Sequence, residues 1–365
     1  MPGQHLRKGK APFAPAGIVE TPTMGRKTPK KVTAGNNDKP PIKAGGKPAA
    51  MEWGRLVLIN FTVLISLLLV LLAGGEVYYR YFCDSTDSFG LSRVTKRWFE
   101  RHYRMNNAGF RDNVEYKWEP VPVKPRVLFV GDSFTAGHGI ADVDKRFANI
   151  IRKERPDREV FVLAVNGFDT GLESEMLANL LRRGYQPGWV VLVYSLNDIA
   201  DIVPEWDGIL KRIYEQDKKP GFLARHSYFI DILNCRLKAL RDPDIARYYQ
   251  FVKAAYEGPL MEAQQKRLAG LNARIKAAGG KLLVVTFPFM NALGPGYEYR
   301  AIHENLDRFW EAQGVPHLDL LPVFEGQPVK KLTLNRFDPH PNEAAHALAA
   351  EAIGDFLDSQ VRKKR

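Results

Sequence analysis

Apolar and polar residues follow two distinct patterns along this chain. The twenty residues from Leu56 to Gly75 carry no charge, and such a run is long enough to cross a bilayer core as one helix. From about residue 124 onward, short apolar runs are separated by amphipathic segments. The first pattern predicts a transmembrane helix over residues 54–76, and the second predicts a folded domain over residues 124–361.

The folded domain shows the alternation that is typical of parallel sheets. Short apolar runs predict buried strands at Arg126–Val130, Glu159–Val165, Trp189–Tyr194 and Lys281–Phe287. Amphipathic periodicity predicts helices at Arg146–Glu154, Leu172–Arg183, Pro259–Ala278, Ala301–Gln313 and Ala344–Leu357. Strands alternating with helices form parallel βαβ units, so we expect a three-layer α/β/α sandwich. Residues 199–258 break the rhythm with an irregular helical pattern too long for an ordinary connection, which predicts an inserted subdomain.

Two other interpretations of the apolar run are weaker. A cleaved signal peptide would lie nearer the N-terminus, with a shorter apolar stretch and an A-x-A-like site. A buried core helix is disfavoured by the length and the Leu and Val content. Residues 77–123 would then form a juxtamembrane lead-in, which begins with interfacial aromatic residues and ends in an extended Pro-rich stretch at 120–125.

Positive charge is concentrated at the two ends of the chain. Residues 1–52 contain 10 Lys and Arg against 3 Asp and Glu, and residues 362–365 are all basic. Residues 77–361 hold 38 basic and 37 acidic residues, so the folded domain is almost neutral. Because positive residues stay in the cytoplasm, we expect a cytoplasmic N-terminus and a periplasmic or extracellular C-terminal domain.

The same distribution argues against nucleic-acid binding. The sequence pI of about 9.5 would favour it, but the excess charge lies in the tails and not on the folded domain. The tail of residues 1–52 is rich in Lys, Pro, Gly and Ala, which predicts disorder. We expect this tail to signal topology and aid solubility, with binding of anionic lipid head groups as the alternative.

Cysteine and glycine motifs limit the cofactor chemistry. Cys83 and Cys235 could pair in an oxidising compartment, although a domain of this size does not need such a bond. Two cysteines without neighbouring histidines do not indicate a zinc site. Phosphate-binding loops and dinucleotide-binding motifs are absent from the sequence, so no cofactor and no metal is predicted.

Three polar motifs lie at or after predicted strands. Ser133 ends a GDS motif after the first strand, Asn197 lies in SLND after the third, and His340 lies in DPHP, a rigid loop before the last helix. The carboxyl ends of parallel strands share one edge, so these residues can meet there. Taken singly, Ser133 also suits a helix N-cap and Asn197 a turn. Of the other histidines, we expect His346 to be a packing or capping residue and His138 to lie near the mouth of the site.

Together these residue types suit acyl transfer. A serine hydroxyl becomes a nucleophile when a neutral imidazole such as His340 takes its proton, and Asp338 can hold that imidazole in the required tautomer. The side-chain amide of Asn197 and the backbone N–H groups of Ser133 and Gly167 are candidate oxyanion donors, although Gly167 also suits a simple turn.

The ordered set of motifs resembles the SGNH/GDSL hydrolase superfamily across roughly residues 104–358. The resemblance implies a flavodoxin-like sandwich of about five parallel strands. It assigns Ser133 as nucleophile, His340 and Asp338 as base and acid, and the Ser133 amide, Gly167 amide and Asn197 side chain as oxyanion hole. The stretch 107–111 looks like that of a bacterial, membrane-anchored branch.

Two positions depart from the family pattern. Ser195 stands where the third motif usually begins with glycine. The usual Asp-x-x-His spacing is Asp-x-His here, because Phe337 lies three residues before His340. A similar short spacing occurs in relatives that modify exopolysaccharides such as alginate, so we retain Asp338 as the acid.

The sequence therefore predicts a membrane-anchored, extracytoplasmic serine O-acyl esterase or acyltransferase. We expect it to act on ester groups, above all O-acetyl groups, of cell-envelope or extracellular glycans, with envelope polysaccharide machinery as a partner. A hydrolase of lipid esters or thioesters at the membrane surface is the main alternative. A catalytically silent glycan-binding assembly component is another, which the complete Ser, Asn and His motifs disfavour.

Overall fold

The computed structural model describes residues 50–118, 123–217 and 220–362. The chain divides into two compact units, residues 1–61 and residues 62–365. Most of the basic tail predicted to be disordered lies outside the described residues, as do residues 120–122 of the Pro-rich lead-in.

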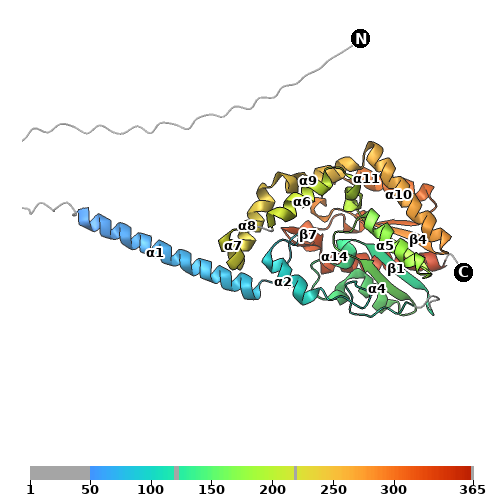
Figure 1. The fold of residues 1–365 in the computed structure, drawn as a ribbon, viewed down its shortest axis with the longest axis horizontal. Coiled ribbons are helices and arrows are strands. Elements are labelled where there is room, and N and C mark those ends of the chain that lie inside the picture. The colour runs from blue at the N-terminus through green and yellow to red at the C-terminus, as the bar shows by residue number, and fades with distance from the viewer. Residues whose placement is uncertain (1–49, 119–122, 218–219, 363–365) are drawn as a thin grey trace, which may run out of the picture. The chain divides into compact units, whose positions relative to one another are not determined.

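A long apolar helix comes first in the described chain (Figure 1). This helix, α1, covers Ala50–Val77 and is followed by a π-helix, η1, at Tyr78–Phe82. Within the described residues it is the one helix that is long and apolar enough to cross a membrane, and none of its most apolar window is buried. A core helix would bury these side chains, so the core-helix alternative does not describe α1.

The central sheet has five parallel strands in the order β2-β1-β3-β4-β5. They cover Arg126–Gly131 (β1), Glu159–Ala164 (β2), Trp189–Ser195 (β3), Lys281–Phe287 (β4) and His317–Asp319 (β5). The first four lie where the apolar runs predicted strands. The fifth was missed by pattern because its three residues include a single apolar side chain. The predicted sandwich with a parallel sheet of this size is confirmed.

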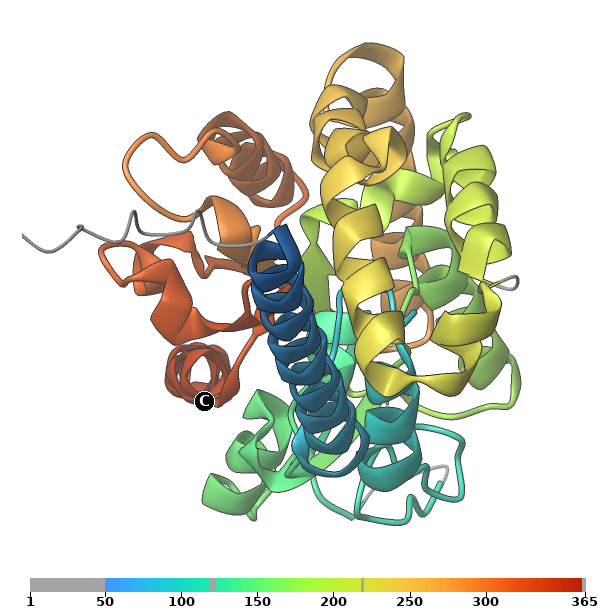
Figure 2. The same cartoon turned by 90° about the vertical axis from the view of Figure 1, so that its left-hand side faces the viewer.

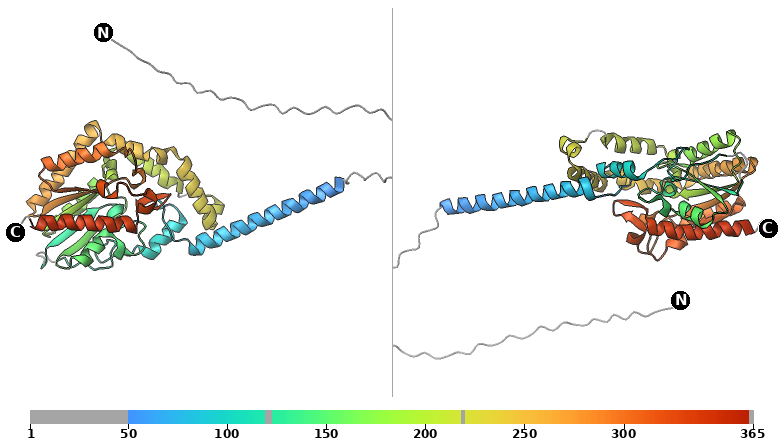
Figure 3. Two further views of the ribbon diagram at one scale, coloured as in Figure 1. Left: turned by 180° about the vertical axis from the view of Figure 1, so that it is seen from behind. Right: turned by 90° about the horizontal axis from the view of Figure 1, so that it is seen from below.

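Helices cover both faces of the sheet (Figures 1 and 3). On one face α4 (Phe147–Glu154) packs against α14 (Glu343–Arg362), and on the other α5 (Thr170–Arg182) packs against α10 (Gly258–Ala277). The strand residues between these layers, including most of β1 and β3, are fully buried. Because both faces are covered, the strands are continuous apolar runs and do not alternate with polar residues.

Between β3 and α10, the described residues form four helices. After the 3₁₀ segment η3 (Leu196–Ile202) they are α6 (Trp206–Asp217), α7 (Phe222–His226), α8 (Tyr228–Arg241) and α9 (Pro243–Ala255). Helix α8 packs against η1 and against α2 (Arg93–His102), so the helices between β3 and α10 contact the segment that follows α1. No disulfide joins Cys83 to Cys235.

The remaining elements complete the domain. They are α3 (Ser133–Ala136), η2 (Val143–Lys145), η4 (Met290–Ala292), α11 (Arg300–Ala312), α12 (Leu321–Phe324), α13 (Val329–Leu332), β6 (Thr333–Asn335) and β7 (Asp338–Pro341). The DPHP motif was expected to be a loop, and this was wrong because it forms β7, antiparallel to β6. Its two prolines are tolerated because a two-stranded pair consists of edge strands only.

Candidate active site

A tight turn holds Ser133 at the carboxyl end of β1. A Cβ added at Gly131 would lie 2.3 Å from Oγ1 of Thr135, so the turn requires glycine. Asp132 is the N-cap of α3, and its carboxylate accepts a hydrogen bond from the Phe134 amide at 2.9 Å. Ser133 is the first residue of α3, so the N-cap reading does not explain its presence.

His340 and Asp338 reach Ser133 from β7. Residues i and i+2 of a strand point to the same face, so the Asp-x-His spacing places both side chains on one side of β7. The Nε2 atom of His340 lies 2.9 Å from Oγ of Ser133, and its Nδ1 lies 2.5 Å from Oδ1 of Asp338. Of the two side chains, Asp338 is fully buried and His340 is 11% exposed. Serine, imidazole and carboxylate therefore form a continuous hydrogen-bonded series.

Burial and ion pairing act in opposite directions on the two groups of β7. Burial alone would raise the pKa of Asp338, but the neighbouring His340 and His138 hold the pKa of that carboxyl well below its usual range. Burial alone would lower the pKa of His340, and the Asp338 carboxylate reverses this and raises it above the ordinary histidine pKa. The arrangement keeps an ionised carboxylate beside an imidazole of increased basicity.

The second oxygen of Asp338 has two further partners that the sequence did not identify. Thr86 Oγ1 donates to Oδ2 at 2.5 Å, and Nε2 of His138 lies 3.1 Å from the same oxygen. The side-chain amide of Asn166 donates to Nδ1 of His138 at 2.8 Å, which leaves the ring proton of His138 on Nε2. His138 was expected near the mouth of the site, but it is 4% exposed and lies behind Asp338.

The sequence carries a signal for some of these partners and not for others. His138 lies a few residues after the serine motif, and this proximity in sequence was the available signal. Asn166 directly precedes the oxyanion candidate Gly167 but was given no role of its own, and Thr86 belongs to none of the motifs. His346 is fully buried on α14, where its Nδ1 accepts a hydrogen bond from the Phe147 amide at 3.4 Å, as expected for a packing residue.

Asn197 and Ser195 are tied to the serine turn through Asp132. Asn197 donates from Nδ2 to Oδ2 of Asp132 at 3.3 Å, and Ser195 donates from Oγ to Oδ1 at 3.1 Å. The serine that replaces the family glycine therefore links β3 to the turn after β1. Burial raises the pKa of Asp132, while the Phe134 amide, Asn197 and Ser195 act against that shift. An amide nitrogen carries two N–H groups, so Asn197 has one to offer a ligand.

Gly167 lies in the turn between β2 and α5, next to Asn166. Its φ of 82° is left-handed, and a Cβ added there would meet no atom within 4 Å. This backbone conformation is sufficient to explain why the position is glycine. The neighbouring Asn166 accepts a hydrogen bond from the Tyr103 hydroxyl at 3.2 Å, which places the turn against the residues around His138.

Arg111, from the Asn107–Arg111 stretch, supports the loop after α3. Its guanidinium donates to the carbonyl oxygens of Gly137 at 2.5 Å and Ala136 at 3.2 Å, and also to Ile140. The side chain is buried, which lowers the pKa of Arg111 to about 10. The buried Arg111 guanidinium therefore holds the loop that carries His138 through the backbone carbonyls of that loop.

Within the described residues, one group of side chains gathers donor atoms closely enough to suggest a metal. The donor atoms of His138, Asp338 and His340 lie within 4.8 Å of one another. Each already has a hydrogen-bonding partner in the protein, and His340 directs its remaining nitrogen to Ser133. These hydrogen bonds account for the close approach of the three side chains.

Comparison with known proteins extends this description. The GDSL-like lipase/acylhydrolase family matches residues 129–348, more than half of the chain. None of the curated proteins matches it. Similar solved structures include TesA, with 18% identity, 64% of this chain and 97% of that chain covered, and a TM-score of 0.39. The psychrotrophic esterase EstA from Pseudoalteromonas sp. has 15% identity, 66% and 100% coverage, and a TM-score of 0.40. The acetyl xylan esterase AlAXEase has 13% identity, 62% and 97% coverage, and a TM-score of 0.39.

The family match includes the segments that bring Ser133, Asn197 and His340 to one edge of the sheet. The chain therefore belongs to the GDSL-like lipase/acylhydrolase family and is a serine hydrolase of the esterase type.

Proposed function

We propose that this protein is an extracytoplasmic O-acyl esterase or acyltransferase, anchored in the membrane by α1, with Ser133, His340 and Asp338 as its catalytic triad. The observation that carries the proposal is the series of contacts from Ser133 Oγ to His340 and from His340 to Asp338, at 2.9 and 2.5 Å. This is the order of nucleophile, base and orienting acid that acyl transfer requires.

In the proposed mechanism, Oγ of Ser133 attacks the carbonyl carbon of an ester while Nε2 of His340 takes the hydroxyl proton. The negative charge that develops on the carbonyl oxygen is stabilised by the side-chain amide of Asn197 and the backbone N–H groups of Ser133 and Gly167. The tetrahedral intermediate then expels the alcohol, which receives the proton from His340, and an acyl-serine remains. Water or a second hydroxyl attacks this acyl group in the same way and releases Ser133.

The burial of Ser133 supports a substrate whose acyl group is small. Ser133 is 9% exposed, and the Phe134 ring lies 5.4 Å from the imidazole of His340, measured between ring centroids. An acetyl group can enter such a site with less rearrangement than the chain of a lipid ester. Together with a location outside the cytoplasm, this supports O-acetylated glycans of the envelope as substrates and favours them over lipid esters or thioesters.

The nucleophile is tested on the full chain in detergent micelles, with p-nitrophenyl esters of increasing acyl length. We expect fastest release from the acetyl ester, and a fluorophosphonate adduct on Ser133 that is lost in Ser133→Ala. Ser359→Ala, which alters an exposed serine on α14, is the control and should label normally. An adduct on another serine at an undiminished rate would reject the assignment, and preference for long acyl chains would favour the lipid-ester alternative.

Acyl transfer is separated from hydrolysis by adding a soluble glycan acceptor and measuring acetylated glycan by mass spectrometry. If Ser133→Ala leaves the cellular function intact, the silent binding role replaces the enzymatic one. Topology is tested with a reporter fused after Arg365. The positive charge before Leu56 predicts that the reporter is active only outside the cytoplasm, and cytoplasmic activity contradicts the proposed location.

A further inference from the structure

The inserted helices α7 and α8 expose an apolar patch. It consists of Phe222, Leu223, Leu233, Leu237 and Leu240, which are 73, 62, 45, 39 and 64% exposed. The three leucines of α8 are spaced four and three residues apart, so they form one stripe along that helix. A row of exposed leucines beside an exposed phenylalanine is more typical of a surface that contacts another phase or molecule than of a solvated face.

The helices that carry the patch are held against the residues at which the apolar helix ends. Glu76 accepts hydrogen bonds from the Ser227 hydroxyl at 2.6 Å and the Phe229 amide at 3.1 Å. One residue earlier, Gly75 faces the Phe229 ring, which a Cβ would meet at 3.0 Å. Arg80 donates to the His226 carbonyl at 2.9 Å. The start of α8 and the end of α7 therefore lie at the level where α1 would leave a bilayer.

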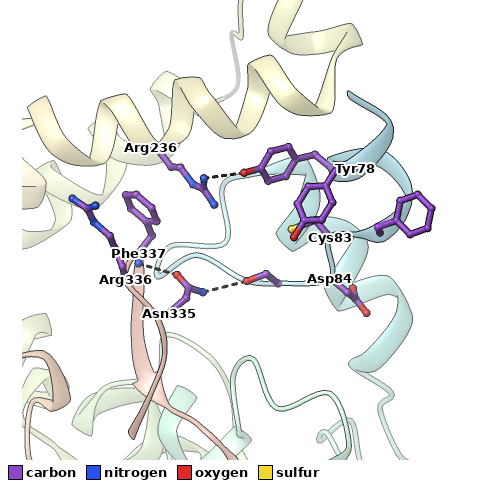
Figure 4. A pocket seen from close by; sticks show the side chains of 10 residues that line it. Tyr78, Cys83, Asp84, Arg236, Asn335, Arg336 and Phe337 are labelled. Atoms are coloured by element: carbon purple, nitrogen blue, oxygen red, sulfur yellow. Dashed lines mark hydrogen bonds between the residues drawn. The ribbon is translucent and has the colours of Figure 1, made fainter. Parts of the chain in front are cut away.

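The opposite side of α8 faces the protein. Asp231 on this side is buried and accepts from the Arg93 amide at 2.7 Å. Arg236, which borders the leucine stripe, donates to the Tyr79 hydroxyl at 3.0 Å. Arg236 also borders a cavity of about 510 Å³ between η1, α8 and the loop before Asp338 (Figure 4). The leucine stripe is exposed, and Figure 2 shows the helices between β3 and α10, in yellow-green and yellow, together on one side of the domain.

The charge of these two helices differs from that of the neutral domain. Between Gly221 and Arg241 there are four basic residues and one acidic residue, and the acidic residue, Asp231, is the buried one. Arg225 and Arg241 are exposed beside the apolar patch. Apolar side chains bordered by cations are the composition of helices that lie in the interface of a membrane with anionic lipids.

We propose that the patch on α7 and α8 rests on the surface of a phospholipid bilayer, with its cations among anionic head groups. The inference depends on the membrane anchoring in the proposed function. It assigns the insertion a second membrane contact next to α1. Residues 85–88, which follow η1, contact the β6–β7 pair through hydrogen bonds of Ser85, Thr86 and Ser88. A bilayer contact of the patch would therefore fix the orientation of the active site above the membrane.

The test uses the full chain in vesicles of phosphatidylcholine and phosphatidylglycerol, with photoreactive benzoylphenylalanine at position 223 or, separately, 237. We expect a phospholipid adduct at both positions after irradiation. Leu172 on α5, a leucine of similar exposure outside the patch, is the matched control and should give none. An adduct to a second copy of the chain, or equal lipid labelling at position 172, would overturn the proposal.

A second measurement separates this inference from the proposed function. In Phe222→Asp/Leu223→Asp we expect loss of the lipid adduct at position 237, while the chain stays embedded through α1 and p-nitrophenyl acetate hydrolysis is unchanged. Persistent labelling at 237 in this variant would contradict a contact made by the patch as a unit. Hydrolysis without any lipid adduct would overturn the bilayer contact and leave the enzymatic proposal intact. A lipid adduct without hydrolysis would overturn the enzymatic proposal and leave the bilayer contact intact.

Discussion

Nε2 of His138 lies 3.1 Å from Oδ2 of Asp338, while Nδ1 of His340 lies 2.5 Å from the other oxygen of the same carboxylate. The two imidazole rings stack, with centroids 4.2 Å apart. Asp338 is thus held between two histidines, and Thr86 adds a third side-chain donor. This network fixes the direction in which the carboxylate faces His340.

For His138 we predict a positioning effect on the rate. His138→Ala should lower kcat with little change in KM, because His138 orients Asp338 and does not line the ester. A hydrogen bond to a charged group contributes about 1.5–3 kcal/mol, which sets a fall of roughly ten- to a hundredfold. His138→Gln, which can present an N–H to Oδ2, should recover part of the rate. A purely structural residue would instead lower the thermal midpoint and leave kcat per folded enzyme unchanged in both variants.

Asp338→Asn should preserve the fold but fail to hold the imidazole in the productive tautomer. By analogy with other serine hydrolases of this design, we expect kcat to fall by about 10⁴-fold. Steady-state kinetics on p-nitrophenyl acetate measure this fall in kcat, and circular dichroism verifies that the variant is folded. A fall below about tenfold, equivalent to roughly 1.4 kcal/mol, would indicate a Ser133–His340 dyad.

Asn197→Ala should remove one oxyanion donor. The expected loss is about 10²–10³-fold in kcat, or roughly 2.7–4 kcal/mol, with KM little changed. Because Asn197 also donates to Asp132, the variant Ser195→Ala is the useful control, since it removes a different donor to the same carboxylate. If both variants lose activity equally, Asn197 supports the serine turn through Asp132 and does not act as an oxyanion donor.

The sequence was informative wherever the signal lies in consecutive residues. The four long strands are apolar runs, and Ser133, Asn197 and His340 lie in short motifs beside predicted elements. The partners of Asp338 could not be found in this way. Thr86 is 252 residues from Asp338 along the chain and His138 is 200 residues away, so their meeting depends on how β7 packs against the segment after α1.

The prediction of a loop at the DPHP motif failed for a related reason. Prolines usually indicate a loop. The motif is a strand because Asp338 pairs with Asn335 of β6, and β6 is a short element with no apolar pattern of its own. Strand β5 escaped detection because the supporting contacts come from β4 and α11 and not from its own three residues.

The raised pKa of His340 predicts the acid limb of the pH–rate profile. The neutral imidazole is the base, so kcat/KM should rise as pH increases through the His340 pKa, and the half-maximum should lie above the ordinary histidine value of 6.5. Asp338→Asn removes the carboxylate that raises this pKa, so the limb should move to lower pH. A wild-type half-maximum below 6.5 would contradict the electrostatics of the site.

Glu173 on α5 presents a different kind of carboxyl. It is fully buried, and within the described residues neither of its oxygens has a hydrogen-bonding partner. Burial, together with the nearby Asp132, Asp169 and Asp201, raises the pKa of Glu173 well above its ordinary value. The folded state therefore retains a proton that the unfolded chain releases near pH 4.5, its unperturbed value.

Stability should accordingly fall as pH rises above the unfolded pKa, and the decrease should end once pH passes the folded pKa. Glu173→Gln stays neutral at every pH, so it should raise the thermal midpoint at about pH 8, and this gain should disappear at about pH 4. Scanning calorimetry of the solubilised full chain at both pH values measures the difference. Glu175→Gln, at an exposed position on the same helix, is the matched control and should change neither midpoint appreciably. A gain from Glu173→Gln that is equal at both pH values would mean that packing or helix propensity, and not the buried charge, is responsible.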